Sequence, residues 1–442
     1  MKRLLGEAGF FAYLDALNQP YTRALRVNLL LRPDGTPPCP IEGLGAPVPW
    51  AKGAYFVEGD ARPGLSPLHE GGLFYMQEPS ALTAVTALDP QPGERVLDLC
   101  AAPGGKSTQI AALMAGRGLL CCNEPIPSRA QILSRNMERM GVRNAVVLSA
   151  MPDALAPRFP AFFDRILVDA PCSGEGMFRR QPEARDEWDA DAPRRCADRQ
   201  MEILAQAAKM LRPGGTMVYS TCTFNDTENE GVLRRFLALH PEFSLVPFAL
   251  PGLPEAKDGY LHLYPHEMRG EGHFVSRLKK ADGADEADAP VQAAPQRKAP
   301  ARAAAKGKAP APIALPDVFS DAFAPERLYT AGDALWMLPE GISIERLSGL
   351  RVLRTGLLLA HAEGKRSEPD HALAMALRPE EAARTASLTQ TQALAYQAGE
   401  TLSLGDLPGG YTLLCCEGVS LGWGKQAGGL MKNHYPKGLR RR

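Results

Sequence analysis

Two cysteines in this chain stand just past two segments that are predicted β-strands. Cys172 lies in DAPCSGEG and Cys222 in STCTFND, and small and polar residues surround both. A thiol at the carboxyl end of a parallel strand lies on the edge where open α/β sheets bind their ligands. One such cysteine could be a buried small hydrophobe. Two of them, each in a turn of this composition, indicate a nucleophile and a helping group.

The chemistry open to such a pair is attack on an unreactive ring carbon. Methylation at carbon 5 of a pyrimidine is one case, because a thiolate added to carbon 6 makes carbon 5 nucleophilic. A base must then remove the hydrogen from carbon 5 so that the thiol can leave, which divides one difficult step into two easier ones. Asp169 ends the apolar segment RILVD and is costly to bury without a partner, so we expect it to face the site. Cys222, Asp169 and Cys172 could supply the three groups required, with the thiols in either order.

A glycine-rich segment, LDLCAAPGGKST, precedes both cysteines. It matches a phosphate-binding P-loop at Gly105-Lys106-Ser107 but has Cys100 where that motif needs glycine. The alternative is the first turn of a methyltransferase-type Rossmann sheet, in which small residues let the backbone approach S-adenosylmethionine. The small residues in question are Ala101, Ala102, Gly104 and Gly105.

Glu124 favours the second interpretation. It ends the next predicted strand, about 20 residues on, where an acid binds ribose hydroxyls in dinucleotide-type sheets. A phosphate-binding loop gives no reason for an acid there. Asp153, after the third strand, could accept a hydrogen bond from an adenine amino group, although a loop aspartate is commonly a turn or N-cap residue. Lys106 is either a solvent-exposed lysine at a helix N-terminus or a catalytic or phosphate contact.

Strand and helix signals alternate through the middle of the chain, which predicts a doubly wound, mostly parallel sheet. The predicted strands are RVLDLC, LLCCNE, NAVVLS, FDRILVDA and TMVYSTC. We expect a small α+β domain over 1–70, the sheet domain over 71–280, an Ala/Pro/charged linker over 281–315 and a β-rich C-terminal region over 316–442. Asn225 or Asp226, with Glu230, predicts a capping box for the helix that follows the last strand.

Composition restricts the class of protein. Of the 442 residues, 45% are apolar and 23% are charged, which is typical of soluble globular domains, and the formal net charge is zero. Any basic surface must therefore be local. No apolar run reaches the roughly 20 residues of a membrane-spanning helix. The nine cysteines include no C-x-x-C pair, so we expect no metal site, reduced thiols and a cytoplasmic location.

The blocks CAAPGGKST, DAPCSGEG and STCTFNDTENE resemble the signature blocks of the Sun (Fmu) family of RNA 5-methylcytosine methyltransferases, from Tyr75 to about Lys280. The resemblance implies a Rossmann-like fold and S-adenosylmethionine as cofactor. It implies that Cys222 is the nucleophile, that Cys172 assists product release and that Asp169 lies near the target base. The implied cofactor contacts are Cys100, Ala101, Ala102, Pro103, Gly104, Gly105, Lys106, Glu124, Asp153 and Asp169.

The flanks refine this resemblance. The C-terminal segments resemble the RsmF-type bacterial 16S rRNA enzymes, which end in a PUA-like RNA-binding domain, and RALRVNLL resembles the N-terminal RNA-contacting segment of that group. We therefore expect a monomer that acts on 16S rRNA or the small ribosomal subunit. The basic C-terminal tail, with Trp423 and Tyr435 interleaved, is expected to contact RNA by stacking and charge. Alternatives are a tRNA enzyme of the same family, a DNA-type enzyme with the thiol roles exchanged, a P-loop nucleotide-hydrolysing protein, and an assembly factor with a dead site.

Overall fold

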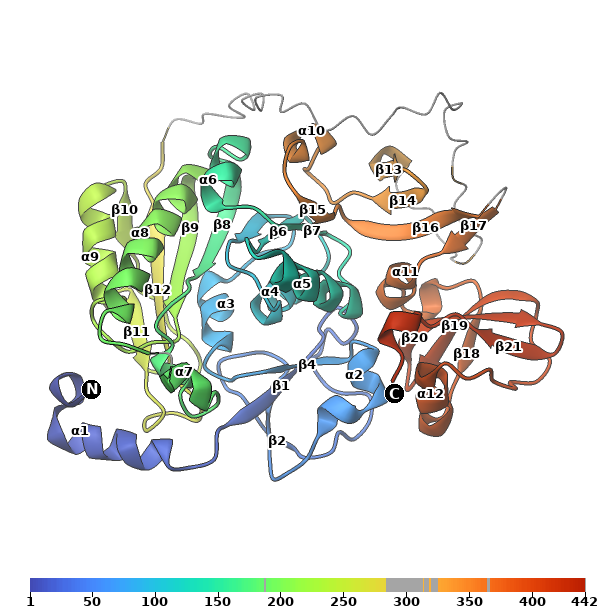
Figure 1. Cartoon of the computed structure of the whole chain (residues 1–442), viewed down its shortest axis with the longest axis horizontal. Helices are drawn as coiled ribbons and strands as arrows, with labels where there is room; N and C mark the ends of the chain where they lie inside the picture. Colours follow the sequence, from blue (N-terminus) through green and yellow to red (C-terminus); the bar gives the residue numbers. More distant parts are fainter. Residues whose placement is uncertain (187, 284–312, 314–317, 319–324, 364–365, 442) are drawn as a thin grey trace.

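The computed structural model of the chain describes residues 1–186, 188–283, 313, 318, 325–363 and 366–441. The described residues form four β-sheets, and the largest one lies at the centre of the molecule (Figure 1). Most of the predicted linker, 281–315, lies outside the described residues.

The central sheet has the strand order β10-β12-β9-β8-β5-β6-β7-β15, with β11 beside β12. Five strands in the middle are mutually parallel: β5 (Arg95–Asp98), β6 (Leu119–Asn123), β7 (Ala145–Leu148), β8 (Phe163–Asp169) and β9 (Leu211–Thr221). Antiparallel strands extend it beyond β9: β10 (Phe243–Leu245), β11 (Tyr260–Leu263) and β12 (His273–Lys280). The five parallel strands consist of near-continuous apolar runs, which suit strands that are covered on both faces of the sheet.

Helices cover both faces of the sheet, which confirms the predicted doubly wound architecture. One layer consists of α3 (Leu82–Leu88), α4 (Gly105–Leu113) and α5 (Pro127–Arg139). The other consists of α6 (Pro152–Leu155), α8 (Ala192–Met210) and α9 (Glu230–Leu239). Successive strand residues alternate between the layers: Val96 packs with the first and Leu97 with the second. Cys121 and Cys122 are fully buried in these two cores, as expected for small apolar residues.

The N-terminal part contributes a second, antiparallel sheet with the order β2-β3-β1-β4. Its elements are α1 (Lys2–Leu17), β1 (Arg23–Val27), β2 (Leu44–Pro47), β3 (Ala54–Val57), α2 (Pro67–Glu70) and β4 (Phe74–Gln77). In Figure 1 it lies below the central sheet, and α1 extends from it to the lower left, below α7 (Pro182–Asp186).

The C-terminal part contains two further four-stranded sheets (Figure 1). The first comprises β13 (Leu328–Ala331), β14 (Ala334–Met337), β16 (Leu357–Glu363) and β17 (Arg366–Pro369). The second comprises β18 (Thr385–Ser387), β19 (Gly410–Cys416), β20 (Val419–Ala427) and β21 (Leu430–Asn433). Three helices accompany them: α10 (Ile344–Leu347), α11 (His371–Ala376) and α12 (Gln390–Ala398).

One short strand of the C-terminal part joins the central sheet. β15 (Val352–Arg354) pairs antiparallel with β7 and so covers the edge that β7 would otherwise expose. Arg354 is only 3% exposed and donates to the carbonyl of Val142 (2.7 Å). The central sheet is thus completed by residues about 200 positions downstream of β7.

The end of the chain packs against the N-terminal sheet. Leu25 and Phe74 share one apolar core with Leu414 and Leu421 of the last sheet. Gln397 donates to the carbonyl of Pro67 (3.0 Å). Arg441 in the tail also donates to the carbonyl of Ser66 (2.9 Å), so part of the basic tail fastens the two ends of the chain together.

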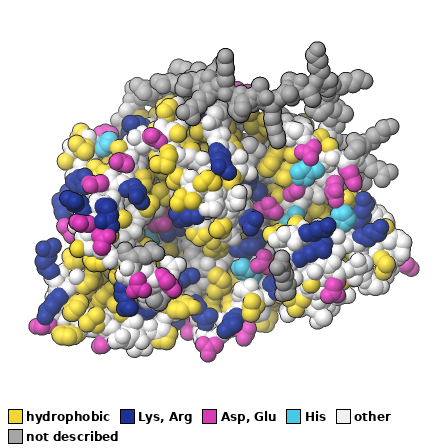
Figure 2. Space-filling view, viewed as in Figure 1, with side chains coloured by type: hydrophobic (Ala, Val, Ile, Leu, Met, Phe, Trp, Pro, Cys, Tyr) yellow, Lys and Arg dark blue, Asp and Glu magenta, His cyan; other side chains and the backbone are white. Residues whose placement is uncertain are grey.

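The expectation that Trp423 and Tyr435 are free to stack on RNA bases is wrong. They are 2% and 3% exposed, respectively. The Trp423 indole donates to the carbonyl of Asp370 (2.8 Å), and the Tyr435 ring packs edge-on against Tyr396. The face in Figure 2 shows Lys and Arg side chains interspersed with Asp and Glu, in keeping with the zero net charge. Within the described residues, no helix combines the length and apolar character needed to cross a bilayer.

Candidate active site

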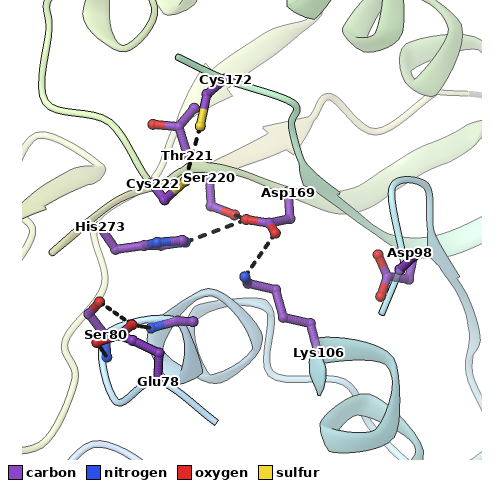
Figure 3. Close-up of polar contacts among 12 residues, drawn as sticks. Glu78, Ser80, Asp98, Lys106, Asp169, Cys172, Ser220, Thr221, Cys222 and His273 are labelled. Atoms are coloured by element: carbon purple, nitrogen blue, oxygen red, sulfur yellow. Dashed lines mark hydrogen bonds and ion pairs between the residues drawn. The ribbon is translucent and has the colours of Figure 1, made fainter. Parts of the chain in front are cut away.

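The two cysteines meet at the carboxyl edge of the central sheet (Figure 3). Cys222 directly follows β9, and Cys172 lies three residues past the end of β8. β8 and β9 are parallel neighbours, so the loops that leave them emerge at the same edge. The two Sγ atoms are 3.2 Å apart, and both residues are half-buried. A thiol here can therefore donate a hydrogen bond to a neighbouring thiolate.

Asp169, the last residue of β8, lies beside the thiols in an enclosed polar cluster. Lys106 Nζ donates to its Oδ2 (2.8 Å), and the hydroxyl of Ser220 donates to its Oδ1 (2.8 Å). His273 Nε2 is 3.5 Å from the same Oδ1. Burial alone would raise the pKa of Asp169, but the charge of Lys106 and the proximity of His273 hold it well below its usual range. The carboxylate is therefore ionised at neutral pH.

Lys106 lies at the start of α4, where its side chain reaches across the site instead of extending into solvent. Only 14% of the side chain is exposed. Burial opposes its charge, yet the charge of Asp169 prevails and raises the pKa of Lys106. The solvent-exposed interpretation of this lysine is wrong, because the loop before α4 turns the helix start toward the end of β8.

The electrostatic surroundings of the two thiols differ. The positive charge of Lys106 interacts with Cys222, whereas the negative charge of Glu228 acts on Cys172. The hydrogen bond to Cys222, burial and that carboxylate all raise the pKa of Cys172 well above its usual value. A nearby cation stabilises a thiolate and a nearby anion destabilises it. The site thus keeps Cys172 protonated, while the ammonium of Lys106 acts on the side of Cys222.

The glycine-rich segment forms a backbone cradle between β5 and α4. Gly104 adopts φ +112° and caps the helix start, a conformation that suits glycine. A Cβ on Gly105 would lie 3.2 Å from the ring of Tyr75, so a side chain there would crowd the ring. The backbone around the cradle is held by neighbours: Asn136 donates to the carbonyl of Pro103 (2.8 Å) and Arg129 to that of Ala102 (3.1 Å).

Two acids line the ends of the adjacent strands. Glu124, after β6, is 2% exposed, accepts from the backbone N–H of Ile126 (3.0 Å) and pairs with Arg129 (3.3 Å). Asp98, at the end of β5, was not singled out by the sequence. Its Oδ2 accepts from Ser107 (2.6 Å), while its buried Oδ1 has no hydrogen-bond partner among the described residues. Burial raises the pKa of Asp98 to about 7.

Asp153 stands apart from these buried groups. It is exposed in the first turn of α6, and its carboxylate makes no hydrogen bond or ion pair with another described residue. A free carboxylate at a helix start is also what a plain N-terminal turn residue provides. Nothing in its surroundings distinguishes the two interpretations of this residue, so its adenine contact stays a prediction.

Several site residues escaped the sequence analysis. Ser220 pairs in register with Asp169 across β8 and β9, so the strand register could have indicated it. His273 carries no such signal, because it reaches the site from β12, about 50 residues after Cys222. Glu228 lies in the loop after Cys222, but its contact with the loop of Cys172 is not visible in the sequence. The predicted capping box is wrong: α9 begins at Glu230 with Asn229 as its N-cap, and no side chain caps it. Asn225 instead contacts Glu228 in the loop before the helix (2.8 Å).

The N-terminal helix reaches the loop that follows Cys172. Arg179 forms a buried two-pronged ion pair with Glu271 (2.7 and 2.8 Å) and donates to the carbonyl of Ala16 in α1 (2.6 Å). The ring of Tyr13 packs edge-on against Phe224, two residues past Cys222. The two thiol loops are thus supported from outside the sheet domain.

Four family profiles match the chain in sequence order. The profile described as 16S rRNA methyltransferase RsmB/F matches residues 85–279, and the N-terminal domain of 16S rRNA methyltransferase RsmF matches 1–79. The RsmF rRNA methyltransferase first C-terminal domain matches 316–377, and the methyltransferase RsmF PUA domain matches 383–441. The last two correspond to the two C-terminal sheets.

Individual relatives agree with these profiles. The chain is 33% identical to the ribosomal RNA small subunit methyltransferase F of Erwinia tasmaniensis, over 99% of this chain and 95% of that protein. It is 34% identical to the protein of the same name from Klebsiella pneumoniae, over 97% of this chain and 92% of that one. Among solved structures, a methyltransferase homologue from Pyrococcus horikoshii superposes with a TM-score of 0.51 at 29% identity, covering 63% of this chain and 97% of that one.

Proposed function

The chain belongs to the RsmB/F family of 16S rRNA methyltransferases, and from this premise we propose that it methylates carbon 5 of a cytosine in 16S rRNA. The family uses S-adenosylmethionine as its methyl donor. The observation that carries the proposal is the 3.2 Å separation of two thiols beside a partly buried Lys106–Asp169 pair. Such a pair suits a reaction that needs a covalent nucleophile and, afterwards, a second group to release it.

Cys222 is the nucleophile in this mechanism. Its thiolate adds to carbon 6 of the cytosine and forms an S–C bond, and the electron pair of the carbon 5–carbon 6 double bond moves toward carbon 5. The order of the thiols rests on charge, since the cation of Lys106 acts on Cys222 and the anion of Glu228 on Cys172. Cys172 remains protonated and donates its S–H to the thiolate.

Asp169 orients the base. An ionised carboxylate accepts hydrogen bonds only, so it binds the protonated ring nitrogen 3 or the amino group of cytosine. Lys106 and Ser220 hold the carboxylate from two sides and limit its movement. Addition of the thiolate brings negative charge onto the ring, and a proton taken up from water at nitrogen 3 neutralises it. The Asp169 carboxylate accepts a hydrogen bond from that N–H and is already in place before the reaction starts.

The residues at the carboxyl ends of β5 and β6 fit S-adenosylmethionine. The cradle of residues 100–106 offers backbone next to a helix start, Glu124 can accept from ribose hydroxyls, and Asp98 has a buried oxygen without a partner. When bound, S-adenosylmethionine supplies the methyl group that carbon 5 receives. The P-loop alternative for this segment is set aside, because the family is one of methyltransferases.

Cys172 completes the cycle. Once Cys222 is bonded to carbon 6, it no longer accepts the hydrogen bond from Cys172, and Cys172 loses its proton to water. The resulting Cys172 thiolate accepts the hydrogen of carbon 5 as a proton. The electron pair of that C–H bond restores the double bond, and the S–C6 bond breaks with its electrons returning to Cys222. A cytosine inside a helix cannot reach sulfurs that lie below the surface, so the base must leave its stack. The C-terminal PUA domain and the N-terminal sheet provide surfaces that can bind the RNA around the target base.

Substitution of each thiol tests the mechanism. Purified Cys222→Ala, incubated with 16S rRNA and S-adenosylmethionine, should form no protein–RNA adduct and transfer no methyl group. Cys172→Ala should accumulate an adduct that survives a denaturing gel, because release is blocked. Adduct in Cys222→Ala and none in Cys172→Ala would reverse the roles and establish the DNA-type order.

The RNA class is tested separately. Mapping of 5-methylcytosine in cells that lack this protein should show a lost site in 16S rRNA, restored by the wild-type gene and not by Cys222→Ala. Loss confined to tRNA would favour the tRNA alternative. An unchanged map, together with intact cofactor binding, would favour an assembly factor without catalysis.

A further inference from the structure

Glu228 is a fully buried acid that lies between the two thiol loops. Its carboxylate accepts four hydrogen bonds. Oε2 accepts from the backbone N–H of Ser173 (3.0 Å) and from Gln200 Nε2 (2.9 Å). Oε1 accepts from Asn225 Nδ2 (2.8 Å) and from the hydroxyl of Ser173. Its backbone carbonyl accepts from the hydroxyl of Tyr219 (2.5 Å).

These partners belong to three separate segments. Ser173 directly follows Cys172, Asn225 belongs to the loop after Cys222, and Gln200 lies in α8. Gln200 also donates to the carbonyl of Pro171, the residue before Cys172 (3.0 Å). A second contact joins the loops, since the hydroxyls of Ser173 and Thr223 are 2.9 Å apart. The carboxylate therefore connects the loop of Cys172 to the loop of Cys222 and to a rigid helix.

All four donors to the carboxylate are uncharged groups. Burial raises the pKa of Glu228, and the hydrogen bonds from Ser173 and Asn225 oppose that rise. An ionised carboxylate is an acceptor only, so it can receive every one of these donors at once. A glutamine side chain has the same shape but turns an NH₂ group toward two of the donors, which leaves buried polar groups unpaired.

The two thiols depend on this contact to different degrees. Cys222 follows the last residue of β9, and Thr221 is paired in register with Phe274 of β12. Thr221 also donates its hydroxyl to Asn229 (2.6 Å). Cys172 sits farther from its strand, in a loop whose path is fixed by Ser173 and Pro171. The sheet positions Cys222, whereas Cys172 depends on contacts between loops. Farther along its loop, Gly176 donates to the carbonyl of Cys222 (2.8 Å) and Glu175 accepts from the N–H of Phe224 (3.0 Å). The contacts of Ser173, the residue next to Cys172, converge on Glu228.

We propose that Glu228 is a positioning residue that holds Cys172 in place for proton removal from carbon 5, without a part in the attack by Cys222. The proposal rests on the two-thiol mechanism given above. It goes beyond that mechanism because it assigns the release half of the reaction to a group that does not touch the substrate. A displacement of about 1 Å can slow a reaction about 100-fold, so loss of the contact should mainly affect release.

The test compares adduct and product in matched variants. Glu228→Gln should bind S-adenosylmethionine as the wild type does, form the RNA adduct, and release methylated RNA about 100-fold more slowly. Adduct should therefore accumulate on a denaturing gel, as in Cys172→Ala. Asp226→Asn is the control: that acid lies in the same loop, but its partly exposed carboxylate pairs with Arg234 instead of with the loop of Cys172, and we expect wild-type turnover.

Ser173→Ala provides a second variant in case Glu228→Gln does not fold. It removes one donor and leaves the carboxylate in place, so adduct should accumulate to a smaller extent. Wild-type turnover in both folded variants would overturn the proposal. So would loss of adduct in Glu228→Gln when Cys172→Ala still accumulates it, because both halves of the reaction would then depend on Glu228. Absence of adduct in Cys172→Ala itself would instead refute the two-thiol mechanism, and the positioning role with it.

Discussion

Two regions of the central sheet bury charged side chains in opposite ways. In the thiol site, formed by Cys172, Cys222, Asp169 and Lys106, the cation and the carboxylate face each other at 2.8 Å beside the reacting sulfurs. At the C-terminal junction, where β15 meets β7, buried arginines donate mainly to backbone carbonyls. The pairs there are Arg354 with Val142 (2.7 Å) and Arg158 with Arg346 (3.1 Å).

This difference distinguishes charges that take part in the reaction from charges that hold two segments together. A carbonyl is a weak, fixed acceptor, so an arginine bound to several of them joins two segments without creating a reactive charge. A carboxylate and an ammonium at the end of parallel strands shift each other's pKa and stand ready for a polar substrate. Changes in the thiol site should therefore alter turnover, and changes at the junction should alter stability.

The largest expected effect is on turnover in the thiol site. Asp169→Asn leaves the ammonium of Lys106 without its carboxylate and removes the negative charge near the base. We expect kcat to fall about 100- to 1,000-fold, as for loss of other preorganised electrostatic contacts. Methyl incorporation into 16S rRNA measures it. A fall in kcat of less than about tenfold would contradict the comparison, since Asp169 would then have a structural role like that of the charges at the C-terminal junction.

The second effect is a pH dependence of stability at the carboxyl edge. The pKa of Asp98 is raised to about 7 in the folded protein, against about 3.9 in an unfolded chain. Between these values the folded state binds a proton that the unfolded state has lost, so stability falls as pH rises from about 4 to about 7. Asp98→Asn should remove this slope and be the more stable protein above pH 7.

Unfolding by urea at several pH values, without cofactor, measures the slope. Equal slopes in wild type and Asp98→Asn would show that the buried carboxylate is ionised at little cost. Asp98 would then resemble the charges of the junction instead of those of the thiol site.

The third effect is on stability at the junction. Arg354→Ala leaves a cavity and an unpaired carbonyl at Val142, and we expect the free energy of unfolding to fall by about 2 kcal/mol. The kcat of the folded protein should stay within about twofold of wild type, because β7 does not carry the thiols. Arg351→Ala, an exposed neighbour in the same segment, is the control. A large loss of kcat without a loss of stability would contradict the expectation that changes at the junction alter stability and not turnover.

The smallest effect is on the affinity of the protein for S-adenosylmethionine. Glu124→Gln removes a buried charge at the end of β6, and the dissociation constant for S-adenosylmethionine should rise about tenfold, or about 1.4 kcal/mol. Asp153→Asn changes an exposed carboxylate, and we expect a rise of less than about threefold. Isothermal titration calorimetry measures both. The reverse order would make Asp153 the principal acid of the cofactor site.

The fold was predictable wherever local pattern decides it. The apolar segments before Cys100, Glu124 and Cys172 are strands in the structure, because buried parallel strands need continuous apolar runs between turns. Strands of this kind place their loops at one edge, which is why the cysteines could be assigned to a shared site. The predicted capping box of Asn225 or Asp226 with Glu230 failed because Asn225 contacts Ser173 of the other thiol loop and Glu230 pairs with His262 of β11, which the local sequence does not reveal.

The short strand β15 could not be predicted from the sequence either. Its three residues show no period that distinguishes a strand, and its partner lies about 200 residues earlier. The burial of Trp423 and Tyr435 likewise depends on Asp370 and Tyr396, which come from other elements. Aromatic residues among basic ones give the same sequence pattern whether the rings are exposed or packed.

By itself, the sequence determined which groups are present and which strand each one follows. Residue type and apolar spacing are local properties, and they establish that two thiols, a lysine and an acid come from neighbouring turns. Only the tertiary structure decided which thiol lies near a cation and which near an anion, and which buried acid connects the two loops. Those relations depend on distances between segments 50 or more residues apart, such as Ser173 and Glu228. The packing of the whole sheet and its helices sets such distances, and no single segment of the sequence determines that packing.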